Sequence, residues 1–523
     1  MKTLFNDGWS FKKIPFQENY DYDKARTLQG LSLVALPHDY LIYDCHNLYE
    51  NSIGVYKKNF FIDRILDKHY EIYFEGVYMD SSVYLNGVHL GDWKYGYSSF
   101  HYNMDEAIVE GENELTVIVR HQSYNSRWYS GAGIYSNVYL ICCDANNFVT
   151  DGFYITTVKN KRHYDLVLEF DVVMDFNSEA SIRIQLYDNL MHEIVDAKYK
   201  LTEVTINNHI LVTIGDLQVK EWSADEPNLY SFKAGLVYKD KIIDDYKTNI
   251  GFRYIEFDPS KGMVVNGKHT KLRGMCLHHD LGALGAAVNR AAVKRQLEIM
   301  KNMGCNAIRT AHNMPSAELL DICDEMGFFV VDEAFDMWQS PKNPYDYARF
   351  FDEWQAKDVA SWIRRDCNHP SVIMWSIGNE IADTHTSKEV PNLTSLLKSE
   401  VEAIDYRGHA MVTIGSNYMP WEGARACADV VKLSGYNYGE KYYDSHHDMY
   451  PDWCIYGSET GSVVASRGIY HFPYSASKLA DEDMQCSALG NSSTSWGAKS
   501  VEQCIYDDET REYSLGQFVW SGF

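Results

Sequence analysis

The second half of the chain alternates short apolar runs with helix-like segments, and this alternation limits the fold more than any other feature. Apolar residues recur at helical spacing in 292–303 and 316–326, and Ser316 supplies an N-cap for the second segment. Such alternation is typical of a parallel sheet covered by helices. Eight strand-like runs predict a closed (β/α)8 barrel, a TIM barrel. The runs are residues 272–276, 305–309, 328–332, 372–377, 411–414, 430–436, 454–457 and 515–520.

Two of these runs lead directly into a glutamate. The fourth is followed by Gly378, Asn379 and Glu380, and the seventh by Ser458 and Glu459. In barrels of this kind the carboxyl ends of the strands carry the chemistry, so we expect Glu380 and Glu459 to converge at one mouth. Two carboxyl groups about 5–5.5 Å apart are what hydrolysis of a glycoside with retention requires. The pair therefore predicts a glycosidase.

Other polar and aromatic side chains follow neighbouring strands and are candidates for binding a sugar. Asn379 stands beside the first glutamate and could hold the sugar 2-hydroxyl, a contact that strengthens in an oxocarbenium-like transition state. His278 and His279 follow the first strand, His312 and Asn313 the second, and Asn437 and Tyr438 the sixth, and Trp520 ends the eighth. The substrate-binding residues that we predict are His279, His312, Asn379, Asn437, Tyr438 and Trp520.

The first half of the chain has the pattern of two β-sandwiches. Residues 1–143 contain short alternating runs and a hairpin signal at Asn86-Gly87, which predict a jelly-roll sandwich. Residues 144–258 contain roughly seven short strands without an ionisable cluster, typical of an immunoglobulin-like sandwich that acts as a spacer. We therefore expect three units, with the barrel in residues 259–523.

Composition narrows the choice of partners and compartment. The formal net charge of −25 repels phosphate backbones and argues against nucleic acid. We expect no membrane span, because no stretch approaches 18 uninterrupted apolar residues, and no secretory leader, because the first residues lack an apolar core. The 11 cysteines are scattered without a C-x-x-C spacing, which favours a reduced cytoplasm over disulfides or zinc. The expected partner is a small carbohydrate, and assembly into a homo-oligomer stays open.

Several longer motifs are spread along the chain. They are D-G-W at 7–9, L-P-H-D at 36–39, S-R-W-Y-S-G-A-G-I-Y at 126–135, R-G-M-C-L-H-H-D at 273–280, C-N-A-I-R-T-A-H-N at 305–313, D-E-A-F-D-M-W at 332–338, the stretch 368–380 and G-Q-F-V-W-S-G-F at 516–523. Through these motifs the chain resembles the family 2 glycoside hydrolases, the β-galactosidase and β-glucuronidase group, over essentially its whole length. The resemblance implies a jelly roll, an immunoglobulin-like domain and a TIM barrel, and retaining exo-hydrolysis of β-linked sugars. It also implies that Glu380 is the acid/base and Glu459 the nucleophile, and that His312, Asn379, Tyr438 and Trp520 touch the sugar or orient the nucleophile.

Two departures from the family pattern shape the remaining expectations. Some members bind magnesium through a Glu and a His after the third strand, but residues 336–338 contain no His, so we expect neither a metal nor another cofactor. The sequence stops just after the eighth strand, so we expect an incomplete barrel in which the eighth helix is missing and the outward face of that strand is exposed.

In relatives the loop that helps to select the sugar follows the eighth strand, and we expect that loop to be missing here. A β-galactosidase is the leading hypothesis, a β-glucuronidase is the enzymatic alternative, and a carbohydrate-binding or inactive fragment is the non-enzyme alternative.

Overall fold

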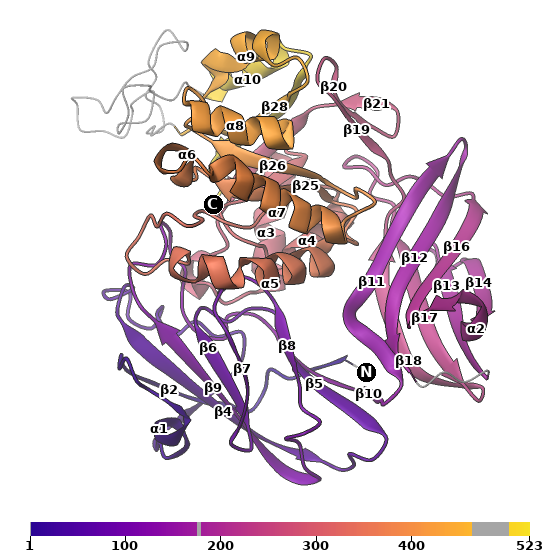
Figure 1. The fold of residues 1–523 in the computed structure, drawn as a ribbon, viewed down its shortest axis with the longest axis vertical. Coiled ribbons are helices and arrows are strands. Elements are labelled where there is room, and N and C mark those ends of the chain that lie inside the picture. The colour runs from indigo at the N-terminus through magenta and orange to yellow at the C-terminus, as the bar shows by residue number, and fades with distance from the viewer. Residues whose placement is uncertain (1, 175–178, 463–500) are drawn as a thin grey trace.

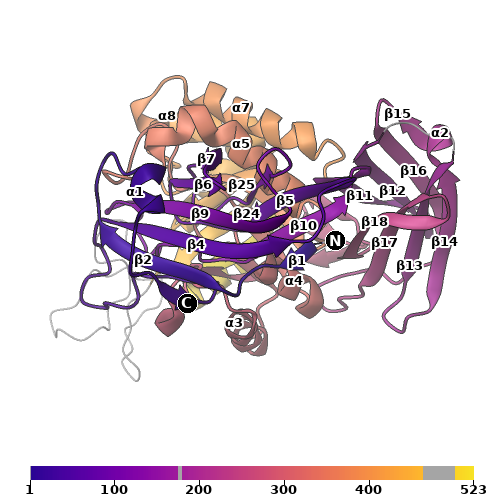
Figure 2. The ribbon, with the colours of Figure 1, turned by 90° about the horizontal axis from the view of Figure 1, so that it is seen from below.

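The computed structural model describes residues 2–174, 179–462 and 501–523, which form two β-sandwiches followed by a closed barrel. Figure 1 shows the first sandwich in indigo below the orange barrel and the second in magenta beside both. Figure 2 shows the strands of the first sandwich passing across the barrel, with the second sandwich at its side. This order confirms the predicted fold class. Within the described ranges, no helix is long and apolar enough to cross a membrane.

The first sandwich packs a four-stranded sheet against a six-stranded sheet. Its core contains Trp9, Tyr56 and Phe74, all essentially inaccessible to solvent. Asn86 and Gly87 both have positive φ and join β6 to β7, which confirms the predicted hairpin. The four-stranded sheet has the order β1 (Lys2–Leu4), β10 (Val138–Asp144), β5 (Lys68–Phe74), β8 (Phe100–Asn103). The six-stranded sheet has the order β3 (Ser32–Val34), β2 (Trp9–Pro15), β4 (Ser52–Ile62), β9 (Gly111–His121), β6 (Ser81–Leu85), β7 (Val88–Trp93), and α1 (Tyr22–Arg26) follows β2.

The second sandwich consists of two four-stranded antiparallel sheets. Leu166, Leu168 and Phe170 alternate with more exposed neighbours along β12 and fill the space between the sheets. A small three-stranded sheet then leads to the barrel. The sandwich sheets are β11 (Asn147–Asn160), β12 (His163–Val173), β16 (His209–Leu217), β15 (Thr205–Ile206), and β14 (Glu193–Lys200), β13 (Ala180–Tyr187), β17 (Tyr230–Tyr238), β18 (Lys241–Ile250), with α2 (Leu201–Val204). The small sheet is β19 (Ile255–Asp258), β20 (Gly262–Val265), β21 (Lys268–Thr270).

Eight parallel strands close into the predicted barrel. The eighth strand pairs with the first, from Leu272 opposite Gly516 to Met275 opposite Val519. Ser316 accepts a hydrogen bond from the Leu319 N–H, which confirms the predicted N-cap. The strands are β22 (Leu272–Leu277), β23 (Ala307–Thr310), β24 (Phe329–Glu333), β25 (Val372–Asn379), β26 (Met411–Ser416), β27 (Leu433–Asn437), β28 (Cys454–Gly461) and β29 (Ser514–Trp520). The helices include α3 (Arg290–Asn302), α4 (Ala317–Met326), α5 (Ala348–Asp366), α6 (Asp383–Thr386), α7 (Val390–Ile404), α8 (Glu422–Val431), α9 (Tyr443–Met449) and α10 (Val501–Glu509).

The eighth strand is more deeply buried than we expected. Leu515 and Phe518 are inaccessible to solvent, and the strand is buried from Ser514 to Phe518. Helix α10 packs against β28 and β29, and β20 also contacts β29. The expectation of an exposed strand is therefore wrong for these residues, because a helix that precedes the strand and a hairpin of the small sheet cover it. Val519 and Trp520 are partly exposed.

The first sandwich is joined to the barrel by polar contacts as well as by apolar packing. The Tyr95 hydroxyl donates to the Ala334 carbonyl, just after β24. The Ser98 hydroxyl donates to Asp358 in α5 at 2.6 Å. The indoles of Trp93 and Trp354 meet edge to face. These contacts fix the sandwich against the barrel, so a loop of the sandwich can reach the mouth of the barrel.

Candidate active site

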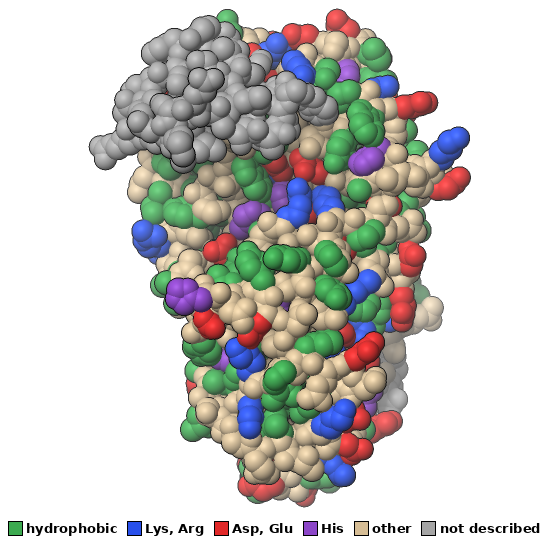
Figure 3. All heavy atoms as spheres, turned by 90° about the vertical axis from the view of Figure 1, so that its left-hand side faces the viewer, with side chains coloured by type: hydrophobic (Ala, Val, Ile, Leu, Met, Phe, Trp, Pro, Cys, Tyr) green, Lys and Arg blue, Asp and Glu red, His purple; other side chains and the backbone are tan. Residues whose placement is uncertain are grey.

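Glu380 and Glu459 lie where the sequence places them, at the carboxyl ends of β25 and β28. Both are buried, with 8% and 3% of their surfaces exposed. The Glu380 N–H donates to the Gly415 carbonyl of β26 at 2.8 Å, and its φ of 46° turns the chain away from the strand. Figure 3 looks onto the side of Figure 1 where the chain ends after β29, and it shows acidic, basic and His side chains gathered there.

Two residues at the end of β27 connect the glutamates. The Asn437 side-chain amide donates to Glu380 Oε1 at 3.2 Å and to Asn379 Oδ1 at 3.0 Å. The Tyr438 hydroxyl donates to Glu459 Oε2 at 2.7 Å. The Tyr438 N–H also bonds to the Glu459 carbonyl. The barrel therefore brings together five residues that the sequence singled out, from three separate strand ends.

The other oxygen of Glu459 faces cationic and imidazole nitrogens. Arg309 Nη1 lies 3.0 Å from Glu459 Oε1, and His312 Nε2 lies 3.6 Å from the same oxygen. Arg309 is fully buried and also bonds through two nitrogens to Glu333, at 2.8–3.0 Å. Its Nη2 donates to Asn379 Oδ1 at 2.8 Å. One buried guanidinium thus fixes both Glu459 and Asn379.

Burial and charge act on Glu459 in opposite directions. Burial raises the pKa of this carboxyl, and the nearby charge of Glu380 raises it further. Arg309, His312 and the Tyr438 hydroxyl act the other way and favour the carboxylate. The net pKa of Glu459 is raised. Two adjacent carboxyls disfavour each other's ionisation, which is why the charge of Glu380 acts on Glu459 in the same direction as burial.

Three further residues surround Glu380, and sequence reasoning missed them. Arg127 comes from the loop between β9 and β10 of the first sandwich, and its Nη1 lies 3.2 Å from Glu380 Oε2. The same guanidinium makes two bonds of 2.6 and 2.8 Å to Asp336. Lys342 Nζ donates to Asp336 Oδ1 at 2.8 Å and to the Asn379 carbonyl at 2.9 Å. The first sandwich therefore supplies part of the site.

The charges around Asp336 decide whether a divalent cation fits there. Burial opposes ionisation, but Lys342 and Arg127 hold the pKa of Asp336 well below its usual range. Asp336 Oδ1 also accepts from Asn379 Nδ2 at 2.9 Å. Two cationic side chains thus occupy the lone pairs of the carboxylate that would have to serve as a ligand, and this donor set does not fit a metal ion. No group of three or more potential ligands lies together in the described ranges.

Aromatic rings line the side of the site next to Glu459. Trp520 stacks on His312, with ring centres 5.2 Å apart and an angle of 6°. His278 meets Trp520 edge to face and stacks on Trp128. His279 turns away, since its Nε2 bonds to the Ser130 carbonyl at 3.2 Å and its ring contacts tyrosines of the first sandwich. Of the two histidines after β22, His278 is thus the one beside the predicted site.

The sequence carried weak signals for the missed residues. Arg309, Glu333 and Asp336 stand in or after apolar strands, where a charged side chain needs a partner to be buried. Arg127 lies in a loop of the first sandwich, and its spacing along the chain does not indicate that the loop reaches the barrel. A search for charges inside apolar strands could have found the first three, but only the folded structure reveals Arg127.

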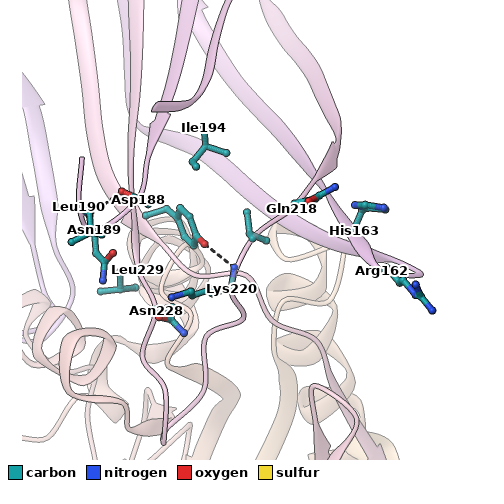
Figure 4. Close-up of a pocket in the computed structure, with 12 residues that line it drawn as sticks. Arg162, His163, Asp188, Asn189, Leu190, Ile194, Gln218, Lys220, Asn228 and Leu229 are labelled. Atoms are coloured by element: carbon teal, nitrogen blue, oxygen red, sulfur yellow. Dashed lines mark hydrogen bonds between the residues drawn. The ribbon is translucent and has the colours of Figure 1, made fainter. Parts of the chain in front are cut away.

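A separate hollow lies on the second sandwich, and Figure 4 shows it. Its volume is about 700 Å³. Asp188 is the single carboxylate among its described lining residues. Its aromatic residue, Tyr230, is buried and accepts from the Lys220 N–H, so the ring offers little surface for a sugar. The described lining of this hollow therefore lacks the pair of carboxylates that hydrolysis of a glycoside with retention requires.

Comparisons with known proteins identify the family of this chain. Models of the glycosyl hydrolases family 2 and of its TIM barrel domain match residues 148–253 and 258–416 and together cover about half of the chain. The beta-galactosidase BoGH2A of Bacteroides ovatus is 36% identical over an alignment of 519 positions, which covers 90% of this chain and 60% of that protein.

Solved structures give the same answer for the fold. A beta-glycosidase from Bacteroides vulgatus, 28% identical, superposes with a TM-score of 0.85 over 99% of this chain and 70% of that one. The Bacteroides uniformis beta-glucuronidase, 20% identical, shares the fold with a TM-score of 0.79 over 100% of this chain and 65% of that one. The chain thus spans 60–70% of the length of these relatives. By both family models, and with the barrel and both sandwiches in place, the chain belongs to glycosyl hydrolase family 2.

Proposed function

We propose that this protein is a retaining exo-β-glycosidase that hydrolyses terminal β-D-galactosides. The observation that carries the proposal is the pair Glu380 and Glu459, two buried carboxyls at one barrel mouth whose partners differ. Glu459 faces Arg309 and the Tyr438 hydroxyl, which favour a carboxylate. Glu380 accepts from the Asn437 amide on one oxygen and faces Arg127 with the other.

The roles that we propose for the two carboxyls follow the pattern of retaining family 2 glycoside hydrolases. In the first step Glu380 donates its proton to the glycosidic oxygen, while a Glu459 oxygen attacks the anomeric carbon and the bond to the leaving group breaks. In the second step Glu380 accepts a proton from water, and the resulting hydroxide displaces Glu459 from the sugar. Asn379 is held by Arg309, Asn437 and Asp336, so its amide can be fixed beside the sugar without rearrangement.

Aromatic rings next to Glu459 support a sugar as the substrate. Trp520 is partly exposed and is held by its stack on His312, so it can offer a flat face to the pyranose ring. The choice of a galactoside rests on the beta-galactosidase of Bacteroides ovatus as a relative.

A β-glucuronidase is the second candidate, and the cations near Glu380 favour it. A glucuronide carries a carboxylate that needs a positive partner, and Arg127 and Lys342 lie beside the acid. Both cations, however, already bond to Asp336, which leaves less charge for a substrate.

The experiment is a panel of nitrophenyl β-glycosides that includes the galactoside and the glucuronide. We expect the galactoside to have the highest kcat/KM and the β-anomer to be the first product seen by proton NMR. A higher kcat/KM for the glucuronide would favour the second candidate. An α-anomer as first product would contradict retention. Sugar binding without turnover would favour the non-enzyme alternative.

A further inference from the structure

Three aromatic rings meet beside the acid/base, and no step described so far uses them. His385 lies in α6, after β25, and Tyr418 and Trp421 lie between β26 and α8. The His385 ring centre is 4.7 Å from that of Tyr418 and 4.8 Å from that of Trp421. Tyr418 and Trp421 are 5.7 Å apart. Both loops follow the carboxyl ends of barrel strands, so this aromatic cluster lies on the same face of the barrel as the glutamates.

The backbone places the cluster next to Glu380 in particular. Glu380 bonds to Gly415, and the Tyr418 N–H donates to Ser416 Oγ at 3.0 Å. The Trp421 N–H then bonds to the Tyr418 carbonyl at 2.8 Å. Burial raises the pKa of Tyr418, and the charge of Glu380 raises it further. Short connections on two adjacent strands therefore hold the cluster within electrostatic range of Glu380.

Trp421 is exposed, and neither core packing nor helix capping explains its position. Its side chain is 44% exposed, whereas Trp338, Trp362 and Trp375 of the barrel are fully buried. Trp421 occupies the N-cap of α8 but makes no side-chain capping bond. The loop is fixed by Arg425, whose Nη1 bonds to the carbonyls of Met419 and Pro420. The indole is thus available at the surface, and its removal leaves those bonds intact.

We propose that Trp421, backed by Tyr418 and His385, forms the subsite for the leaving group and stacks on the flat face of its ring. This inference rests on the proposed function, because the leaving oxygen takes its proton from Glu380 and the departing group must lie on that side. The ligand class is a glycoside whose aglycone carries a ring, either a second sugar or an aryl group. An aromatic platform binds both through the same face-to-face contact.

The test uses thioglycosides, which occupy a glycosidase site but are cleaved poorly. Kd is measured by calorimetry for methyl, phenyl and galactose-linked thio-β-galactosides on the unmodified protein and on Trp421→Ala. We expect the two ring-bearing ligands to bind about 3- to 10-fold more tightly than the methyl ligand, the range given by one stacked aromatic contact. In Trp421→Ala the ratio of the Kd of the methyl ligand to that of a ring-bearing ligand should fall to about one. In Trp421→Phe most of the preference for the ring-bearing ligands should return.

A control separates stacking from a general loss of structure. Tyr406 is 55% exposed and precedes β26, at the opposite end of the strand from Trp421. Tyr406→Ala should keep the full preference for the ring-bearing ligands.

Each outcome decides something. Equal binding of all three ligands by the unmodified protein overturns the subsite and leaves the proposed function standing, and so does a preference that survives in Trp421→Ala. Failure to bind any thio-β-galactoside counts against the proposed function itself, and the subsite fails with it. A Trp421-dependent preference supports the subsite, and comparison of the phenyl and disaccharide ligands shows which ring it favours.

Discussion

Arg127 Nη1 lies 3.2 Å from Glu380 Oε2, so a loop of the first sandwich contacts the carboxyl that follows the fourth barrel strand. The same guanidinium is anchored by two bonds to Asp336. This geometry restricts the position of the Glu380 carboxyl. It also means that the barrel alone lacks one element of the site.

Replacing Arg127 tests this positioning. We expect Arg127→Gln to lower kcat/KM for nitrophenyl β-glycosides by about 10²-fold, the loss that misplacement of a catalytic group by about 1 Å produces. Arg127→Lys keeps the charge but not the planar fork that bonds Asp336 and Glu380 together, so it should restore only part of the lost kcat/KM.

Arg349 provides the matched control for this experiment. It also bridges the barrel and the first sandwich, through Nη1 to Gln122 Oε1 at 2.7 Å, but it lies outside the site. Arg349→Gln should leave kcat/KM unchanged. If it reproduces the effect of Arg127→Gln, the role of Arg127 is to join the two units and not to position the acid.

The two glutamates should respond differently to the leaving group. Glu459→Gln removes the nucleophile, and we expect turnover of every β-glycoside to stop. Glu380→Gln should reduce kcat/KM about 10²- to 10⁴-fold for alkyl glycosides, which need a proton on departure, and far less for dinitrophenyl glycosides. Steady-state kinetics over a series of aglycones checks this. A uniform loss across the series in Glu380→Gln would show that this residue is not the acid.

The raised pKa of Glu459 predicts the acidic limb of the pH profile. Burial and the charge of Glu380 both raise this pKa. The acidic limb of kcat/KM should therefore lie at a pH above about 4.3, the ordinary pKa of a glutamate. Glu380→Gln removes the neighbouring negative charge, so the acidic limb should move to lower pH when measured with a dinitrophenyl substrate. An acidic limb that does not move would assign it to another group.

The sequence was sufficient to place residues that belong to the strands themselves. Glu380, Asn437 and Glu459 follow from the alternation of apolar runs, because the carboxyl ends of parallel strands share one rim. The two sandwiches follow from period-two patterns, as in Leu166, Leu168 and Phe170 of β12.

Contacts between units could not be predicted in this way. Arg127 reaches Glu380 because the first sandwich docks on the barrel, and docking contacts such as those of Tyr95 and Ser98 join residues more than 230 positions apart. The direction of a side chain that follows a strand could not be predicted either, since His278 and His279 are adjacent but face different neighbours. Burial of β29 by α10 and β20 likewise depends on packing between distant segments.

The docking of the first sandwich should itself depend on pH through Asp358. This carboxyl is fully buried in α5 and accepts hydrogen bonds from Ser98 of the sandwich and from Tyr347. Burial raises the pKa of Asp358 from an ordinary value of about 3.9 to about 7, although the hydrogen bonds from Ser98 and Tyr347 lower it. The folded state therefore binds this proton more tightly than the unfolded state does. The contribution of protonated Asp358 to the stability of the folded state is complete below about pH 4 and is lost as pH rises through about 7.

Asp358→Asn removes this ionisation while it keeps the shape of the side chain. We expect the midpoint of thermal unfolding of the variant to rise relative to that of the unmodified protein between pH 4 and 8, because only the unmodified protein then has to bury a charge. Asp352→Asn, an exposed position on the same helix, is the control and should follow the unmodified protein at every pH. Parallel curves for Asp358→Asn and the unmodified protein across this range would show that Asp358 does not set the pH dependence of the interface.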